Sequence, residues 1–484
     1  MRHPAVWSLV ALCWLSGGAP GCSYPSLGEA GPRTSLDLPA RAHRDIDLLF
    51  LIDDSPSMAD KQANLAGGFP RFADALASIP GGLPSIHLGV ATTDLGTSGT
   101  EDTTPGPLIG AVSQGGCDGY GKAGNLQLYR APVTGAPYII DTVDPMTGDR
   151  VRNYTGALSD AFSQIARGAG AAGCGFEQHL SAIKRALDPA NPVNTGFLRP
   201  DALLGVIIIT DEDDCSLAHD AMLASDTTVL GPLQSFRCTR YGITCDSNGQ
   251  TPDAMNQVGA KDRCHSNEAS PYLTKVSDSV AFLKGLKADP AEVFVAGLFA
   301  PPTPVTIELR APQGSATQIP SLVHSCSYTG ADINGDGIPD LEVGDPAVRL
   351  QALVDAFGDH ATASTICEQD LSGGLSRFAD LMKTALGDPC IAGTLTDVDP
   401  GAAGTQAACV ASVVSNADQP DERRAALPRC SPDDATAKNA PCWRLAFDPV
   451  GCPSGDHALL AVVGDDKLPD GARLRASCAV EPAP

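Results

Sequence analysis

Two short acidic segments stand directly after two of the most apolar stretches of this sequence. One is the D-x-S-x-S segment of residues 53–57, and the other is the T-D-E-D-D segment of residues 210–214. Carboxylate and hydroxyl oxygens are the ligands that hard divalent cations prefer, and Mg²⁺ takes six of them in octahedral order. If the two segments lie side by side, the chemistry that they predict is the binding of Mg²⁺ or Ca²⁺.

Two buried strands would bring these segments together. Residues 46–52 and 203–210 are short, nearly continuous apolar runs, a pattern typical of strands buried on both faces of a parallel sheet. Such runs alternate with helical periodicities over residues 45–388, so we expect an α/β domain with a doubly wound, mostly parallel sheet. Sites in such sheets form outside the carboxyl ends of the strands, where both acidic segments stand.

At these residues the chain resembles the von Willebrand factor A family, whose metal-ion-dependent adhesion site uses a D-x-S-x-S motif and an Asp after a later strand. The resemblance covers about residues 45–388 and implies that Mg²⁺ or Ca²⁺ is held by Asp53, Ser55, Ser57 and Asp211. In the family the metal keeps an open coordination position that a partner's carboxylate can fill. The resemblance therefore implies a metal-dependent adhesion or protein-binding module.

The family also uses a Thr from a middle loop, and this chain departs from that pattern. Cys174 stands at about the expected place, and Glu177 could supply an oxygen in its stead. The alternative for the acidic segments is that they only cap helices. Asp54, Ser55 and Ser57 could satisfy free N–H groups at a helix start and favour the helix dipole.

A second candidate cation site lies in the Gly- and Asp-rich residues 332–340. Oxygens at positions 1, 3, 5 and 9, with a glycine at position 6, match the start of a calcium-binding loop. The segment resembles the short loops of dockerin and thrombospondin type 3 repeats, although no pair of helices flanks it. The alternative is a plain turn of Asx and Gly residues. The residues that would hold Ca²⁺ here are Asp332, Asn334, Asp336, Ile338 and Asp340.

The cysteines indicate an oxidising compartment. Of 16 cysteines, Cys13 falls in an apolar leader and Cys22 is expected to carry lipid, which leaves 14 for as many as seven disulfides. We expect Cys174 to pair with Cys215, because the predicted fold puts both at the rim that carries the acidic segments.

The N-terminal region predicts export. Residues 1–22 combine a weakly basic start, an apolar stretch and a GGAPGC ending that resembles a bacterial lipobox. Acylation at Cys22 would anchor the protein to a membrane it does not span, as an outer-membrane lipoprotein of the cell envelope; secretion is the alternative. Residues 23–44 are rich in Pro, Gly and Ala, and we expect a flexible tether.

Composition and charge limit the remaining possibilities. Residues 95–155, 212–270 and 301–344 are long insertions that contain cysteines, and residues 389–484 are expected to form a small cysteine-rich β module. The net charge of −24 argues against nucleic acid as a partner, because phosphate repels such a surface.

These features together favour a binding protein. We expect an exported adhesion module, not an enzyme, whose unknown protein partner is contacted through an acidic side chain. One alternative is a metal-free scaffold that binds through its bridged insertions. An envelope hydrolase is less favoured, since no nucleophile is accompanied by a base and an orienting group.

Overall fold

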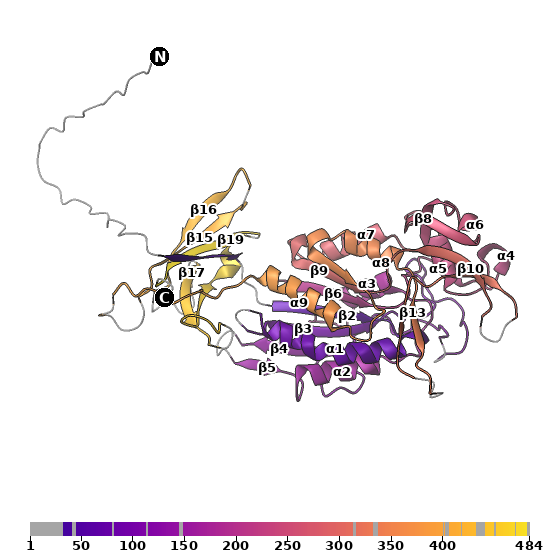
Figure 1. Cartoon of the computed structure of the whole chain (residues 1–484), viewed down its shortest axis with the longest axis horizontal. Helices are drawn as coiled ribbons and strands as arrows, with labels where there is room; N and C mark the ends of the chain where they lie inside the picture. Colours follow the sequence, from indigo (N-terminus) through magenta and orange to yellow (C-terminus); the bar gives the residue numbers. More distant parts are fainter. Residues whose placement is uncertain are drawn as a thin grey trace, which may run out of the picture.

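A computed structural model gives the arrangement of the chain. It describes residues 32–481 apart from short stretches at 41–44, 80–81, 113–114, 145–148, 313–315, 333–336, 400, 402–405, 418, 432–440, 450–451 and 470. The described part is elongated, with the first strand and the C-terminal residues gathered at one end and the second and third insertions at the other (Figure 1).

A seven-stranded sheet forms the centre of the molecule. Its first five strands pair in parallel, and two more extend one edge with antiparallel pairing. The apolar runs predicted as strands at 46–52 and 203–210 are confirmed as its central pair, β2 and β6. Across the sheet the strands are β14 (Ala361–Ser364), β9 (Val293–Leu298), β6 (Leu203–Ile209), β2 (Asp45–Ile52), β3 (Ser85–Thr92), β4 (Ile139–Val143) and β5 (Arg150–Arg152).

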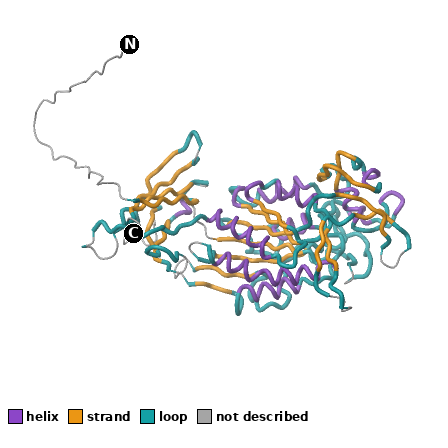
Figure 2. Tube along the Cα trace, viewed as in Figure 1, coloured by secondary structure: helices purple, strands orange, loops and turns teal. Residues whose placement is uncertain are grey.

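Helices cover both faces of this sheet (Figure 2). Along β2, Leu48 and Phe50 pack into one helical layer, while Leu49 and Leu51 pack into the other, because successive side chains of a strand point to opposite faces. The first layer contains α1 (Ala59–Ala77), α2 (Leu158–Gly168) and α9 (Ser372–Leu386). The second contains α3 (His179–Leu187), α7 (Val276–Lys284) and α8 (Val348–Asp355).

The second and third insertions build structure of their own beyond the carboxyl ends of the parallel strands. They share one antiparallel sheet in the order β11-β10-β8-β7, although their strands are far apart in the sequence. A separate hairpin is formed by β12 (Cys326–Thr329) and β13 (Leu341–Gly344). The other elements here are α4 (Thr227–Leu230), α5 (Phe236–Gly242), α6 (Pro252–Met255), β7 (Ile243–Ser247), β8 (Gly259–Ser266), β10 (Val305–Arg310) and β11 (Ile319–Leu322).

The C-terminal module includes a strand from the other end of the chain. Part of the expected tether forms β1 (Arg33–Pro39), which pairs antiparallel with β19 (Arg473–Ala479). Asp37 of β1 forms ion pairs with Arg473 and Arg475, at 2.5 and 3.0 Å. The remaining strands of the module are β15 (Cys409–Ser415), β16 (Arg423–Leu427), β17 (Cys442–Phe447) and β18 (Ala458–Val463).

The fold class expected from the sequence is wrong for this chain. The structure is mixed, with about 25% helix and 30% strand, rather than a doubly wound, mostly parallel α/β fold. Part of the first insertion enters the main sheet as β4 and β5 in antiparallel pairing, and the other sheets of the described residues are small and antiparallel. The apolar pattern identified only the strands buried on both faces, and the shorter, more polar strands of the insertions do not carry it.

Candidate functional site

The two acidic segments meet at one edge of the main sheet. Asp53 follows β2 and Asp211 follows β6, and these neighbouring strands run parallel, so both segments leave the sheet at the same end. The backbone N–H of Asp53 donates to the carbonyl of Ile209 at 2.9 Å and holds the two strand ends together. After Asp53 the chain turns through the short 3₁₀ helix η1 (Pro56–Met58) into α1.

Three side-chain oxygens from these segments lie close together. The hydroxyls of Ser55 and Ser57 are 3.0 Å apart, and the Ser57 hydroxyl donates to Oδ1 of Asp211 at 3.1 Å. Asp53 lies on the buried side of these oxygens. Its Oδ1 accepts the Ser55 N–H at 2.8 Å, and its Oδ2 accepts the Thr210 hydroxyl at 2.7 Å. The structure therefore brings together Asp53, Ser55, Ser57 and Asp211.

The site is buried on one side and open on the other. Asp53 is fully buried, whereas Ser57 is exposed to solvent. Burial, together with the negative charge of Asp211, raises the pKa of Asp53 to about 7. Burial also raises the pKa of Asp211, although the neighbouring Lys61 opposes this effect. In both residues, burial is the largest cause of the raised pKa.

The only compensating charge that touches these ligands in the described residues comes from Lys61, on the first turn of α1. Its ammonium group lies 3.0 Å from Oδ2 of Asp211 and 2.8 Å from Oε2 of Glu342, a residue of β13. Burial disfavours the charged form of Lys61, but the two carboxylates outweigh this effect and raise its pKa above the ordinary value.

The spacing of the three oxygens suits a small divalent cation. With Mg–O bonds of about 2.1 Å, neighbouring ligands of an octahedral Mg²⁺ lie about 3 Å apart, and the Ser57 hydroxyl lies at this distance from both the Ser55 hydroxyl and the Asp211 carboxylate. Across the described residues, however, no three His, Cys, Asp or Glu side chains form a group that could hold a metal ion. A cation here would therefore depend on the serine hydroxyls and on water.

Glu177 lies near this site without joining its hydrogen-bond network. One carboxylate oxygen accepts from the Thr93 hydroxyl, and the other is buried without a hydrogen-bond partner. Burial, followed by the charges of Asp53, Asp54 and Glu212, raises the pKa of Glu177 well above its usual range. The role of Glu177 as a cation ligand stays a prediction.

The last two acids of the T-D-E-D-D segment have structural roles. The Asp213 carboxylate accepts the backbone N–H groups of Arg349 and Leu350 at the start of α8, at 2.9–3.1 Å. Asp214 forms a fully buried ion pair with the Arg349 guanidinium at 3.0 Å. Asp213 therefore caps the start of α8. The capping alternative for Asp54, Ser55 and Ser57 finds no such support, because neither η1 nor α1 has a side-chain hydrogen bond at its N-cap.

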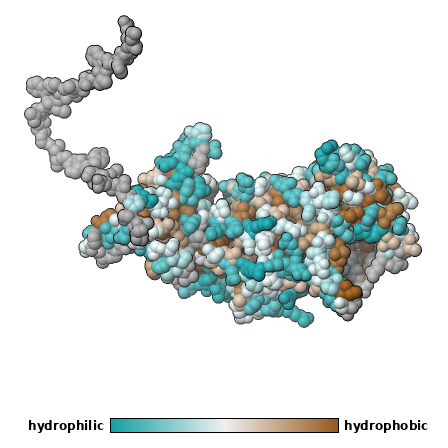
Figure 3. Space-filling view, viewed as in Figure 1, coloured by the Kyte–Doolittle hydropathy of each residue, from teal (hydrophilic) through white to brown (hydrophobic). Residues whose placement is uncertain are grey.

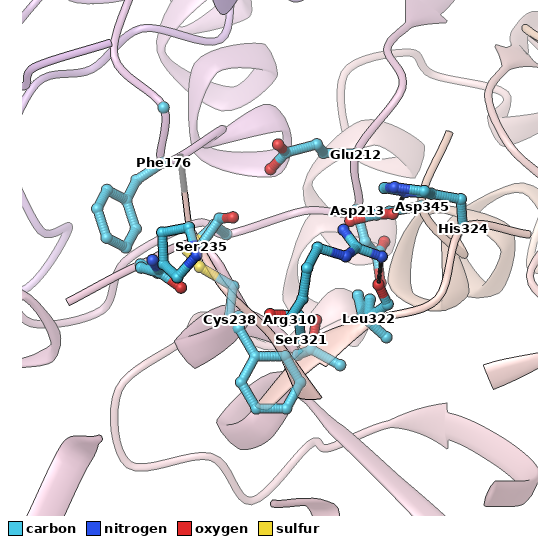
Figure 4. Close-up of a pocket in the computed structure, with 16 residues that line it drawn as sticks. Phe176, Glu212, Asp213, Ser235, Cys238, Arg310, Ser321, Leu322, His324 and Asp345 are labelled. Atoms are coloured by element: carbon cyan, nitrogen blue, oxygen red, sulfur yellow. Dashed lines mark hydrogen bonds and ion pairs between the residues drawn. A yellow bond between two sulfur atoms is a disulfide. The ribbon is translucent and has the colours of Figure 1, made fainter. Parts of the chain in front are cut away.

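A cavity of about 450 Å³ opens beside Glu212 (Figure 4). It lies between the loop after β6, the start of α5 and the β10–β11 strands. Asp345 joins the cavity to the cation site, because its N–H donates to the Asp211 carbonyl at 2.8 Å while its carboxylate holds Nδ1 of His324 at 2.6 Å. The side chains around it combine charged, polar and aromatic groups: Phe176, Glu212, Ser235, Phe236, Arg310, Ser321, His324 and Asp345.

The predicted disulfide between Cys174 and Cys215 is wrong. Cys174 pairs with Cys117, and Cys215 pairs with Cys238. All four cysteines lie in one buried cluster at the expected rim, so the location was foreseen but not the pairing. The insertions fold back over the rim and bring each cysteine a nearer partner. Because Cys174 is bridged, it cannot act as a ligand in place of the family's Thr.

Seven disulfides are present in the described residues, the largest number expected from the sequence. Such a density is typical of proteins outside the reducing cytosol. No helix among the described residues is both long and apolar enough to cross a membrane. The predicted lipidation site, Cys22, lies outside the described residues.

The predicted calcium loop is described only in part. Asn334 and Asp336 lie outside the described residues. The Gly337 N–H donates to Oδ2 of Asp332 at 2.8 Å, and the carbonyl of Asp340 accepts the Gly330 N–H at 2.8 Å. Both contacts lie beyond the paired residues of the β12–β13 hairpin. Calcium binding by Asp332, Ile338 and Asp340 stays a prediction.

Three residues of the site were missed in the sequence. Thr210 stands inside the T-D-E-D-D segment, and Lys61 follows Ser57 by four residues, which is one helical turn, so both carried a visible signal. Glu342 is 281 positions from Lys61, and nothing in the sequence indicates their contact.

Comparison with known proteins leaves the family open. No protein-family model and no curated protein matches the chain. Among solved structures, the pilus adhesin SpaC from Lactobacillus rhamnosus GG, in its open conformation, is similar over 92% of this chain, with 10% sequence identity and a TM-score of 0.28. The chain spans 40% of the length of that adhesin. At this identity and TM-score the likeness carries no argument about fold or activity.

Proposed function

We propose that this chain is an exported protein-binding module whose adhesion site is completed by a divalent cation. The observation that supports it most is the triangle of oxygens from Ser55, Ser57 and Asp211, with spacings of 3.0 and 3.1 Å and an exposed edge at Ser57. Asp53 orients this group from the buried side. A binding role accounts for a site that presents these oxygens at a solvent-exposed edge.

A bound cation would supply one open coordination position at the solvent-exposed edge, and that position suits an acidic side chain of a protein partner. The chain's own residues hold and orient the ion. Ser55 and Ser57 would contact it directly, while Asp53 and Asp211 would act partly through water. The ion would also relieve the repulsion between Asp53 and Asp211, which raises the pKa of Asp53.

Cation binding can be tested by thermal unfolding. Ligand that binds only the folded state stabilises it by RT ln(1 + [L]/Kd), about 2.7 kcal/mol at a hundredfold excess over Kd. Mg²⁺ or Ca²⁺ should therefore raise the midpoint of the wild type and not that of Ser57→Ala. Ser78→Ala, at the exposed far end of α1, is the matched control and should respond like the wild type. If neither cation changes the unfolding midpoint of the wild type, the proposal of a cation site is wrong.

We also propose that the mature protein is anchored to the cell envelope by lipid at Cys22. The lipobox-like GGAPGC ending and the seven disulfides both support export. Mass spectrometry of the membrane fraction should find an acylated N-terminal Cys22. An unmodified N-terminus at another position would contradict the anchor and leave secretion.

A metal-free scaffold is the second candidate, and the cavity beside Glu212 favours it. Two insertions line this cavity through Phe236, Arg310 and His324, so it could hold part of a partner without any ion. Figure 3 shows apolar side chains gathered over the insertions at this end of the molecule. Adhesion that survives chelation but is lost in Phe236→Ala would support the scaffold over the cation site.

A further inference from the structure

Lys61 occupies an unusual position for a lysine, since only 1% of its side chain is exposed. Its ammonium group has three acceptors: Oδ2 of Asp211 at 3.0 Å, Oε2 of Glu342 at 2.8 Å and the Ser57 carbonyl at 3.1 Å. An ammonium group carries three hydrogens, so all of its donors can be satisfied. A charge buried in this way is stable only because the two carboxylates compensate it.

Asp211 is shared between Lys61 and the candidate cation site. Its Oδ2 faces the ammonium group, while its Oδ1 accepts from the Ser57 hydroxyl in the oxygen triangle. A divalent cation at the triangle would draw on the same carboxylate charge. The two positive charges would also repel each other across Asp211, because Lys61 and Asp211 are both buried away from screening water.

Glu342 connects Lys61 to the β12–β13 hairpin. The same face of α1 holds this hairpin a second time, where the Tyr328 hydroxyl donates to Asp60 at 2.6 Å and accepts from the Asn64 amide at 3.1 Å. The disulfide Cys326–Cys367 fixes the base of the hairpin. The Lys61–Glu342 pair therefore links a hairpin side chain to the Asp211 carboxylate, while the backbone just after β13 contacts the Asp211 carbonyl through the Asp345 N–H.

We propose that Lys61 is an internal counter-cation that competes with the bound divalent ion for Asp211. Through its ion pair with Glu342, this competition changes how tightly the β12–β13 hairpin is held against α1. This proposal rests on the proposed cation site. When the ion takes Asp211, the ammonium group retains Glu342 as its carboxylate partner, and the hairpin is held more tightly against α1. Because such coupling is reciprocal, the contact with the hairpin in turn sets the affinity for the ion.

The first test is Mg²⁺ titration by calorimetry on the full mature chain. Lys61→Met should bind Mg²⁺ about tenfold more tightly than the wild type, because the competing charge is gone. Glu342→Gln should bind it more weakly, because Lys61 then pairs with Asp211 alone. Lys287→Met is the matched control: this buried lysine pairs with Asp47 at the opposite end of β2, and its loss should leave the affinity unchanged.

The double variant Lys61→Met/Glu342→Gln covers the case in which Lys61→Met does not fold. It leaves no unpaired carboxylate at position 342, and it should bind Mg²⁺ about tenfold more tightly than Glu342→Gln alone. Hydrogen exchange gives a readout at the hairpin. Mg²⁺ should slow exchange of the amides in residues 326–329 and 341–344 in the wild type but not in Lys61→Met.

The outcomes separate the two proposals. If the wild type binds Mg²⁺ and removal of Lys61 does not tighten binding, the role of Lys61 is overturned while the cation site stands. Tighter binding by Glu342→Gln would also overturn it. If neither the wild type nor any variant binds Mg²⁺, the cation site and the role of Lys61 fall together.

Discussion

At the scale of single residues, His179 gives the chain a defined response to acid. Burial lowers its pKa to about 4, and Asp214 only partly opposes this effect. In the unfolded chain the pKa of His179 is about 6.5. Between pH 6.5 and 4, His179 therefore binds a proton in the unfolded state but not in the folded state. The free energy of unfolding should therefore fall over this range, by up to about 3 kcal/mol from this residue.

Urea unfolding at pH 7 and pH 5 in chelator would measure this contribution. His179→Leu should lose less stability on acidification than the wild type. His265→Leu, at an exposed position, should follow the wild type. Equal losses in wild type and His179→Leu would mean that other groups account for the acid response.

Gly173 shows how closely the middle loop approaches the D-x-S-x-S segment. Its N–H donates to the Asp54 carbonyl at 2.7 Å, and an added Cβ would lie 2.5 Å from the carboxylate of that residue. Asp54 is fully buried and paired with Lys122, so it has little freedom to move. Gly173→Ala should cost about 1–3 kcal/mol in urea unfolding. Gly175→Ala in the same loop meets its nearest atom at 3.4 Å and should change stability by less than about 0.5 kcal/mol.

At the scale of elements, two adjacent glycines of α1 face different surroundings. Gly67 is exposed with no atom within 4 Å of an added Cβ, whereas that of Gly68 would lie 3.0 Å from the backbone nitrogen of Ser372 in α9. Gly67→Ala should stabilise the protein by about 0.5–1 kcal/mol, because Ala favours the helix. Gly68→Ala should be less stable than Gly67→Ala by about 1–2 kcal/mol, because it pushes α9 away. Equal urea midpoints would show that α1 and α9 adjust freely.

The elements also show what the sequence could and could not predict. The runs that became β2 and β6 were recognisable because nearly every residue is apolar, and the acidic segments after them located the site. By contrast, β1 is half exposed, and it forms a strand by pairing with the distant β19, so its local sequence did not indicate a strand. The partner of Cys174 and the contact between Lys61 and Glu342 depend on how the insertions fold back, and local patterns contain no information on such distant contacts.

At the scale of the whole molecule, the chain has two distinct ends. The segment 45–388 is inserted between β1 and the rest of the C-terminal module, so the described N-terminus lies in that module. The carboxyl ends of β2 and β6, which carry the candidate cation site, and the second and third insertions lie toward the opposite end (Figure 1). A lipid at Cys22 would therefore place the module next to the membrane and present the site away from it.

Energy transfer to a membrane dye would test this orientation. The acylated protein would be reconstituted in vesicles that contain a headgroup acceptor, and a donor would be attached through a non-natural residue at Val410 or at Leu341. Both positions are exposed, Val410 in β15 of the module and Leu341 in β13 beside the site. Transfer should be strong from Val410 and weak from Leu341, because the long axis of the molecule separates them, and Cys22→Ser should remove both signals. Equal transfer from the two positions would mean that the protein lies flat on the membrane, where the exposed edge of the cation site would be poorly placed to meet a partner.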